Sequence, residues 1–143
     1  MPDDKELVAY CGLYCGDCFG YQGKIAELSK DLRKELRTVK FDRLVTGIPF
    51  KEFKYYREAY ALMGALVRLK CKNTCRNGSG NPFCAIRKCC IKKGYDGCWQ
   101  CDQFEACKKL DVMETPHAGA CVKNLKRLKK LGVEAFIVGK RDW

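Results

Sequence analysis

Residues 11–18 read CGLYCGDC and place three cysteines within eight positions of the chain. Their spacing is C-x3-C followed by C-x2-C, and spacings of two or three residues let a tight turn direct several sulfurs at one metal ion. Gly12 and Gly16 permit the close turn that this requires. Three ligands from one short loop need a fourth from a distant part of the sequence, for which Cys107 and Cys121 are candidates. We therefore expect this segment to tie the N-terminal region to the rest of the fold.

The chain holds twelve cysteines in 143 residues, and most of the others lie in a second cysteine-rich segment, residues 71–107. It contains further C-x3-C and C-x2-C half-sites of the kind that recurs in tetrahedral zinc sites. We predict ten metal ligands: Cys11, Cys15, Cys18, Cys71, Cys75, Cys84, Cys89, Cys98, Cys101 and Cys107. Cys90 and Cys121 stay open, because adjacent residues such as Cys89 and Cys90 seldom reach the same ion.

Cysteine at this density indicates disulfides, metal sites or redox-active thiols. Disulfide scaffolds are typical of small secreted chains, and the N-terminal residues MPDDKE show no secretory signal. The longest apolar run, residues 59–67, is far shorter than the roughly 20 residues of a membrane span. We therefore expect a cytoplasmic protein without a membrane segment, whose thiols are held by metal.

The net charge is consistent with thiolate metal sites. Lys and Arg number 28 against 17 Asp and Glu, which gives a formal charge of +11. A tetrathiolate zinc site carries a charge of about −2, so filled sites would offset part of this excess. Basic residues also flank the cysteines, as Lys70 and Lys72 do at Cys71. Such cations favour the thiolate over the thiol.

Apolar residues recur every three or four positions over residues 24–39, which predicts an amphipathic helix. The same periodicity predicts helices over 50–70 and 118–131, the latter ended by Gly132. Residues 133–138 are apolar and fit either a helix or a strand. We expect residues 73–97 to form a metal-clamped loop with one helical turn near residues 85–89.

This organisation predicts a single domain over residues 1–143. Its fold class is mainly α, a small helical domain with cysteine-rich, metal-clamped loops. The helical core would comprise residues 24–70 and 118–138, and the cysteine-rich segments 11–18 and 71–107 would be attached to it.

No catalytic motif stands out, and we favour a non-enzymatic protein with no catalytic residue. The chain has one histidine, His117, and neither a phosphate-binding loop nor a dinucleotide fingerprint. His117 precedes Cys121 by four residues, so it is a candidate nitrogen ligand as well as a helix cap or surface residue. The Cys98–Cys101 pair, with two residues between, also fits a dithiol redox motif, although the βαβ context of such motifs is not visible.

Zinc is the metal that scattered paired half-sites favour. A [4Fe–4S] cluster in redox or electron transfer is the alternative, although the ferredoxin run C-x2-C-x2-C-x3-C-P is absent. The C-x3-C-x2-C spacing also occurs in radical enzymes that cleave S-adenosylmethionine, but these need a barrel larger than this chain.

A third hypothesis is a zinc-stabilised nucleic-acid-binding module. Lysines and arginines form a basic stripe on the helix expected at 118–131, and aromatic residues alternate with basic ones over residues 50–60. The competing interpretation assigns those aromatics to the core and the lysines to the solvated face. A protein partner is equally open.

The sequence resembles a known family at its cysteine motifs. CGLYCGDC, followed by YQGKI at residues 21–25, and the run CAIRKCC-x3-G-x3-C-x2-C-x2-F-x2-C over residues 84–107 are similar to the prokaryotic cysteine-rich family called domain of unknown function 3795. The resemblance covers most of residues 9–110. It implies a small cysteine-rich protein that binds metal, with zinc expected, and no established activity. The ten predicted ligands occupy the family's cysteine positions, whereas Cys90 and Cys121 have no place in that pattern.

Overall fold

The computed structural model describes residues 3–143, and this part of the chain is helical without a β-strand, which confirms the mainly α fold class. The α-helices are α1 Phe19–Gln22, α2 Lys24–Thr38, α3 Phe41–Leu44, α4 Tyr56–Val67, α5 Ala85–Lys93, α6 Glu114–His117, α7 Ala120–Leu131 and α8 Val133–Val138. Short 3-10 helices extend or connect them: η1 Asp4–Leu7, η2 Cys15–Asp17, η3 Val45–Gly47, η4 Lys51–Tyr55, η5 Cys98–Gln100, η6 Phe104–Ala106 and η7 Lys108–Met113.

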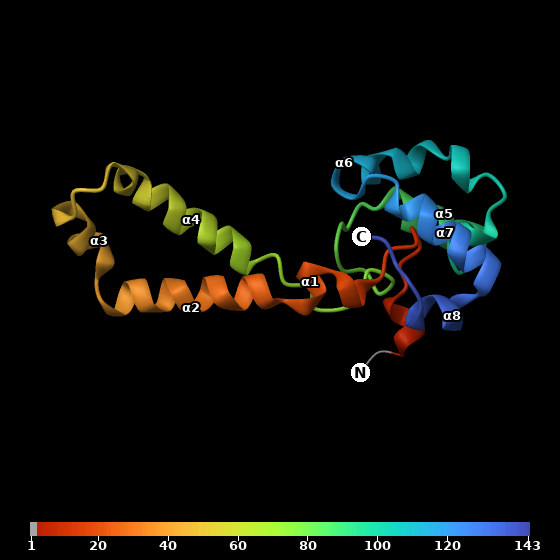
Figure 1. Ribbon diagram of the computed structural model, residues 1–143, viewed down its shortest axis with the longest axis horizontal. Helices are drawn as coiled ribbons and strands as arrows, with labels where there is room; N and C mark the ends of the chain where they lie inside the picture. The colour runs from red at the N-terminus through yellow and green to blue at the C-terminus, as the bar shows by residue number, and fades with distance from the viewer. Residues whose placement is uncertain (1–2) are drawn as a thin grey trace.

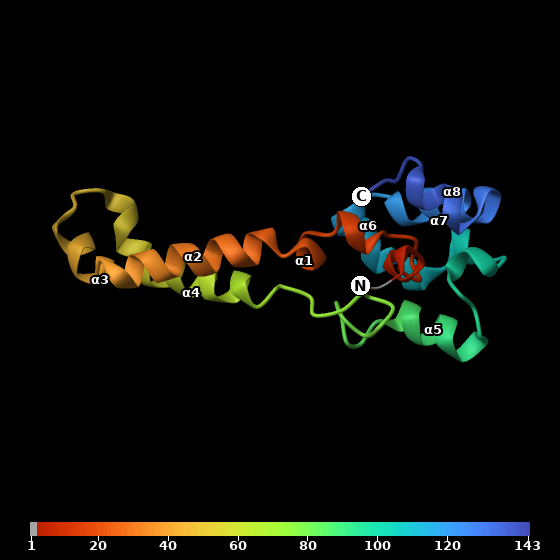
Figure 2. The same cartoon turned by 90° about the horizontal axis from the view of Figure 1, so that it is seen from below.

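The molecule has two parts of different shape. Helices α2 and α4 run antiparallel and project as a long hairpin with α3 at its tip, here called the arm (residues 24–67) (Figure 1). The remaining described residues, 3–23 and 68–143, form a rounded head that contains the C-terminus (Figure 2). Within residues 3–143 no helix is long and apolar enough to cross a bilayer.

The predicted helices correspond to observed ones. The helix expected at 24–39 is α2, that at 50–70 is η4 followed by α4, and that at 118–131 is α7, which Gly132 ends. The undecided segment 133–138 is helix α8. The single turn expected near 85–89 extends further, to the full helix α5, which Gly94 ends in the left-handed conformation.

Small and polar side chains join the two helices of the arm. The guanidinium of Arg33 lies over the ring of Tyr60, 4.4 Å from its centroid. It also covers Gly64, where a Cβ would lie 3.0 Å from the guanidinium carbon. Arg37 donates a hydrogen bond of 2.8 Å to the Tyr60 hydroxyl. On α2, Ser29 is buried against this seam. Polar and cation–π contacts therefore contribute to holding the two helices of the arm together.

The tip of the arm is closed by aromatic residues that pack on each other. The ring of Phe41 lies 5.8 Å from that of Phe53 and 5.4 Å from that of Tyr56. Phe53 in turn contacts Phe50 at 5.7 Å, in the 4.5–7 Å range of favourable aromatic pairs. These contacts explain why residues 41–56 fold back and reverse the chain direction.

The buried core lies in the head. Leu125, Leu128 and Phe136, from α7 and α8, pack with Val8 and are almost completely inaccessible. The turn that contains Cys11 and Gly12 sits directly on α7, because Gly12 has φ +87° and a Cβ there would lie 3.0 Å from the Leu125 side chain. Glycine is the residue that allows both this conformation and this close approach.

The observed core contains only one of the two segments that the sequence predicts for it. The sequence places residues 24–70 in a helical core with residues 118–138, and the second of these segments is indeed buried. In the structure, however, the apolar stripe of α2 is largely exposed, with Leu28 at 60%. Core partners come instead from residues 7–15 and 86–110. Periodicity detects an apolar stripe but not the surface that covers it.

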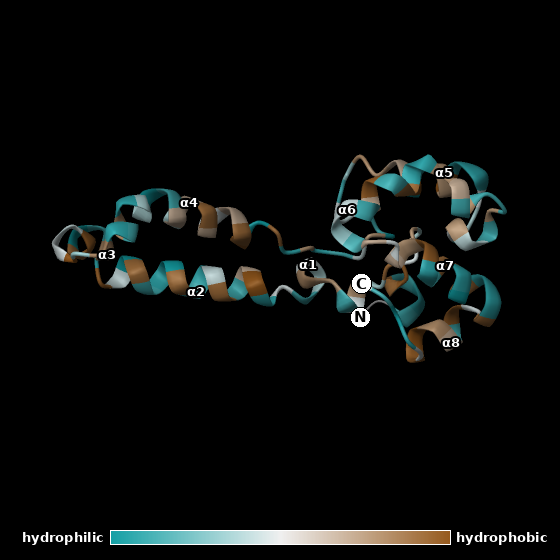
Figure 3. Cartoon of the chain, turned by 45° about the horizontal axis from the view of Figure 1, so that its top comes forward, coloured by the Kyte–Doolittle hydropathy of each residue, from teal (hydrophilic) through white to brown (hydrophobic). Residues whose placement is uncertain are grey.

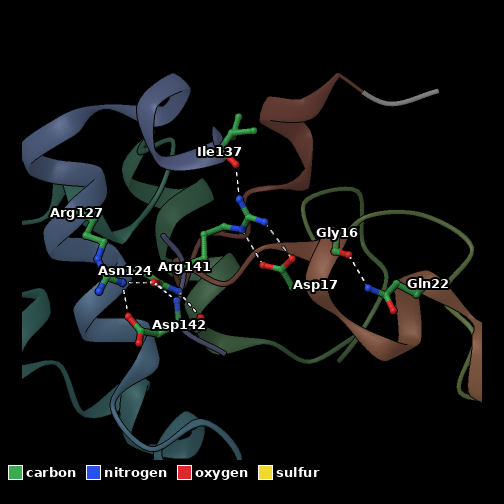
Figure 4. A network of polar contacts seen from close by, with 8 residues as sticks. All are labelled: Gly16, Asp17, Gln22, Asn124, Arg127, Ile137, Arg141 and Asp142. Carbon is green, nitrogen blue, oxygen red and sulfur yellow. Dashed lines mark hydrogen bonds and ion pairs between the residues drawn. The ribbon is translucent and has the colours of Figure 1, made fainter. Parts of the chain in front are cut away.

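The C-terminal tail is fastened to the head by polar contacts (Figure 4). Asn124, which is fully buried, accepts a hydrogen bond from the backbone N–H of Asp142 at 2.9 Å and donates one to its carbonyl at 2.8 Å. The Asp142 carboxylate pairs with Arg127. Arg141 pairs with Asp17 at 2.7 Å, so the tail also holds the loop between the second and third cysteines.

Replacing Asn124 by alanine is expected to lower the free energy of unfolding by about 2 kcal/mol, because two backbone groups of Asp142 lose their partner. The control is Asp142→Asn, which keeps the Asn124 contacts, loses only the ion pair with Arg127, and should cost no more than about 1 kcal/mol. Urea denaturation followed by circular dichroism measures both. Equal stability of Asn124→Ala and wild type would show that the tail is not fastened in this way.

Candidate metal centre

All twelve cysteines lie in the head and all are free thiols. The structural disulfides that the sequence left as an alternative are therefore not formed in residues 3–143. The cysteines group around two cavities. One, of about 400 Å³, is lined by Cys11, Cys15, Cys18, Cys75 and Cys84. The other, of about 520 Å³, is lined by Cys89, Cys90, Cys98, Cys101 and Cys107.

The first group joins the two cysteine-rich segments. The backbone N–H of Cys75 donates a hydrogen bond of 3.3 Å to the sulfur of Cys15, sixty residues earlier. Cys18 and Cys71 approach each other across Gly20, since their sulfurs lie 3.6 and 3.3 Å from where a Cβ on that glycine would be. These four cysteines supply one C-x2-C and one C-x3-C half-site, the spacings that recur in tetrahedral zinc sites. The sequence offers Cys107 and Cys121 as the distant partners of the first loop.

Arginine side chains hold the loops that carry these cysteines. Arg87 on α5 donates hydrogen bonds to the carbonyls of Cys75 at 2.9 Å, Ser79 at 3.1 Å and Asn81 at 2.9 Å, which fixes the loop between α4 and α5. Arg76 donates to the carbonyl of Val8 at 3.1 Å and so binds this loop to the N-terminal segment. The contact with Cys15 and burial raise the pKa of the Cys75 thiol, and the guanidinium of Arg87 offsets only part of this shift.

The second group is centred on a direct sulfur contact. The sulfurs of Cys90 and Cys98 lie 3.6 Å apart in the buried interior. Two thiolates bound to one zinc ion at 2.3 Å in tetrahedral geometry have sulfurs about 3.8 Å apart. The observed pair therefore fits two corners of a zinc site without rearrangement. Thiolates of a cubane cluster bind different irons and lie farther apart.

A third pair joins Cys11 and Cys121, which lie close enough for each to shift the pKa of the other. Cys121 is buried on α7, on the same face as Leu125 and Leu128. Of the two distant candidates that the sequence offers to complete the first cysteine loop, Cys121 is thus the one next to Cys11.

The protonation of each pair is asymmetric. A hydrogen bond from Cys98 lowers the pKa of the Cys90 thiol, and the same contact raises the pKa of Cys98. Hydrogen bonding to Cys75 likewise lowers the pKa of Cys15, and bonding to Cys11 lowers the pKa of Cys121. Each pair thus loses one proton readily and retains the second, because two buried thiolates in contact repel each other. A bound divalent cation would relieve that repulsion.

The sulfur pairs alone do not make complete metal sites. Within residues 3–143, no three or more cysteine, histidine or acidic side chains lie close enough together to hold a metal ion. Cys84 caps α5, where its sulfur accepts a hydrogen bond from the backbone N–H of Arg87 at 3.5 Å. Full tetrahedral coordination would need the remaining cysteines of each group to move toward the pair.

Two members of the sulfur pairs, Cys90 and Cys121, were left open by the sequence. The sequence does hold a signal for both cysteines, which is their spacing from an apolar residue of the same helix. Cys90 lies four residues after the buried Ile86, and Cys121 lies four residues before the buried Leu125. Spacing of i and i+4 puts both residues on the core-facing side. Half-site spacing alone gives no such information, since it counts cysteines and ignores the helix that carries them.

His117 lies beside the first cavity. Its ring packs edge-on against Trp143, with centroids 4.9 Å apart, and its Nδ1 is buried without a hydrogen-bond partner. Burial lowers the pKa of this imidazole, which favours the neutral form that binds metal. These features leave His117 a candidate ligand.

The basic stripe predicted on α7 is partly neutralised. Lys126 pairs with Glu105 at 2.8 Å and Lys129 with Asp102 at 3.2 Å, while Arg127 pairs with Asp142. Three of the cations proposed to bind phosphates thus have acidic partners within the head. The aromatic residues of the arm tip, similarly, pack on one another.

The fold and the sulfur pairs define a small helical, cysteine-rich protein with free thiols gathered in one part of the molecule. A family model matches residues 7–112, and the chain belongs to the family described as protein of unknown function (DUF3795). The match confirms the resemblance seen in the cysteine motifs. Comparison with curated proteins found no match, and comparison with solved structures found none either.

Proposed function

We propose that the protein is a non-enzymatic zinc-binding module in which cysteine thiolates hold the metal and the metal stabilises the head. The observation that carries this proposal is the meeting of Cys15 and Cys75 across sixty residues, where a backbone N–H already donates to the sulfur. Hydrogen bonds to the ligand atoms are characteristic of metal sites that a fold has prepared.

One zinc ion would be held by Cys15, Cys18, Cys71 and Cys75. A second would use Cys90 and Cys98, completed by Cys101 and Cys107 from the same cavity. Zinc would neutralise thiolate charge that the buried interior otherwise disfavours. The remaining buried pair, Cys11 and Cys121, would support the first site from α7.

The test is elemental analysis of protein purified without oxygen, with an optical spectrum of the same sample. We expect two or more zinc ions per chain and no visible colour. Iron with acid-labile sulfide and a brown colour would show instead that the cysteines hold an iron–sulfur cluster. A folded protein that carries no metal at all would contradict the proposal.

A further inference from the structure

The sulfur contact of the second cysteine group also has the geometry of a reduced disulfide. The sulfurs of Cys90 and Cys98 lie 3.6 Å apart, and both side chains are buried. A disulfide bond holds its two sulfurs at about 2.05 Å, so these sulfurs need to approach by only about 1.5 Å to form one. The pair can therefore serve as a dithiol as well as two corners of a zinc site.

Backbone hydrogen bonds hold both cysteines of this pair in place. The N–H of Tyr95 donates a hydrogen bond of 2.9 Å to the carbonyl of Cys90, which ties the connecting loop back to α5. The N–H of Cys98 donates one of 2.9 Å to the carbonyl of Tyr10 in the N-terminal segment. The two sulfurs are thus kept together by contacts of the protein that involve no metal ion.

Helix α5 directs Cys90, and not its neighbour Cys89, toward Cys98. Hydrophobic and hydrophilic segments alternate along this helix (Figure 3). Ile86 and Cys90 are its buried residues, whereas Lys88 is exposed. Cys89 lies about 100° away around the helix axis. An oxidation that joins Cys98 to α5 is therefore expected at Cys90.

A small oxidant can reach the pair through the cavity of about 520 Å³ that both cysteines line. Exposed residues, among them Asp102, Gln103 and Glu105, line the same cavity, so it communicates with solvent. A water molecule takes up about 30 Å³ in the liquid, and hydrogen peroxide is little larger, so the cavity has room for it. Burial of Cys90 at 2% exposure keeps large oxidants, such as the disulfides of other proteins, away from its sulfur.

We propose that Cys90 and Cys98 are an oxidation site at which a hydroperoxide forms a disulfide bond, and that this bond releases the zinc ion of the second site. The release of zinc rests on the proposed function, in which both sulfurs are ligands of that ion. A disulfide sulfur carries no thiolate charge and no longer holds zinc. The two other ligands proposed for this ion, Cys101 and Cys107, leave a tetrahedral shell half empty.

The oxidation takes two steps. One sulfur attacks an oxygen of hydrogen peroxide, the O–O bond breaks, and the thiol becomes a sulfenic acid while one water leaves. The second sulfur then attacks the sulfenic sulfur, an S–S bond replaces the S–O bond, and a second water leaves with the remaining thiol proton. The two sulfurs together lose two electrons, which reduce one peroxide molecule to two waters.

The test treats the full chain, purified with its metal, with hydrogen peroxide. Mass spectrometry of non-reduced tryptic peptides maps the disulfides, and a colorimetric indicator measures the released zinc. Trypsin cleaves at lysines between Cys90 and Cys98, so their disulfide joins two peptides whose fragmentation identifies the cysteines. We expect this disulfide to form first, because its sulfurs are already in contact, and about one zinc ion to be released per disulfide. Dithiothreitol and added zinc should reverse both changes.

Two variants show whether the disulfide is specific to this pair. Cys98→Ser should form no disulfide at Cys90, whose sulfenic acid then oxidises further to the sulfinic acid. The matched control is Cys89→Ala, which removes a cysteine from the same helix and the same cavity. It should form the disulfide and release zinc as wild type does. Circular dichroism checks that both variants keep their helices.

Each part of the proposal has its own contrary result. A first disulfide between Cys98 and Cys101, or among cysteines of the first group, overturns the oxidation site. Zinc that leaves before the disulfide forms, or stays bound after it has formed, overturns the release. A chain that purifies without zinc and still forms the Cys90–Cys98 disulfide contradicts the proposed function and the release, and supports the oxidation site.

Discussion

Chelation of the proposed zinc is expected to abolish the cooperative thermal unfolding transition of the head. Structural zinc sites supply roughly 10 kcal/mol or more of folding free energy each, which exceeds the total stability of most small domains. The cysteine-bearing parts of the head have little regular structure of their own, because α1 and α6 have four residues each and the loop between α4 and α5 has no regular structure. Helices this short are not stable in isolation.

The measurement is far-UV circular dichroism during heating, before and after chelation, with the metal content of both samples determined. Returning zinc should restore the transition, and magnesium at the same concentration should not, since hard oxygen ligands are absent from the proposed sites. Unchanged helicity and melting temperature after verified metal removal would show that zinc does not stabilise the fold.

Periodicity in the sequence located the long helices well. Apolar residues three and four positions apart recur over α2 and α7, whose observed bounds differ from the expected ones by at most two residues. The boundary error is larger for α4, where the first residues of the predicted helix form η4 instead. Aromatic packing at the tip explains this difference, because Phe53 packs against both Phe41 and Phe50 before α4 begins.

Burial could not be predicted in the same way. Leu28 and Leu125 both lie on apolar stripes of amphipathic helices, yet Leu28 is 60% exposed and Leu125 is fully buried. The difference depends on tertiary contacts, since the Leu125 side chain packs against the turn at Gly12, whereas most of the Leu28 side chain stays exposed. Periodicity alone cannot tell these two cases apart.

Cysteine spacing identified half-sites but not which of them meet. The half-sites at residues 15–18 and 71–75 come together, whereas the sequence offered Cys107 and Cys121 as the distant partners of the first loop. The sequence assigned Cys89 to the ligands and left Cys90 open, although the two are adjacent. Helical geometry separates them by about 100°, so only one can face the core at Cys98. In the structure that residue is Cys90.

Replacing Cys90 by alanine is therefore expected to remove one zinc ion per chain and to lower the free energy of unfolding by several kcal/mol. Removal of a small buried side chain that only fills space would cost about 1 kcal/mol. Any loss of unfolding free energy beyond that value is attributed to the lost metal ligand, because the three remaining thiolates leave an incomplete coordination shell. Elemental analysis and urea denaturation of the same preparation give the two quantities.

The variant Cys89→Ala is the control. It shows whether the effect is specific to Cys90 or follows the loss of either cysteine on α5. Cys89 is half-buried and lines the same cavity, but the direct sulfur contact belongs to Cys90. We expect Cys89→Ala to keep the zinc content of wild type and to lose no more than about 1 kcal/mol. The reverse outcome, with zinc lost on substitution of Cys89 and kept on substitution of Cys90, would restore the assignment that spacing alone gives. Metal would then bind only after α5 rotates, since Cys90 now occupies the side that faces Cys98.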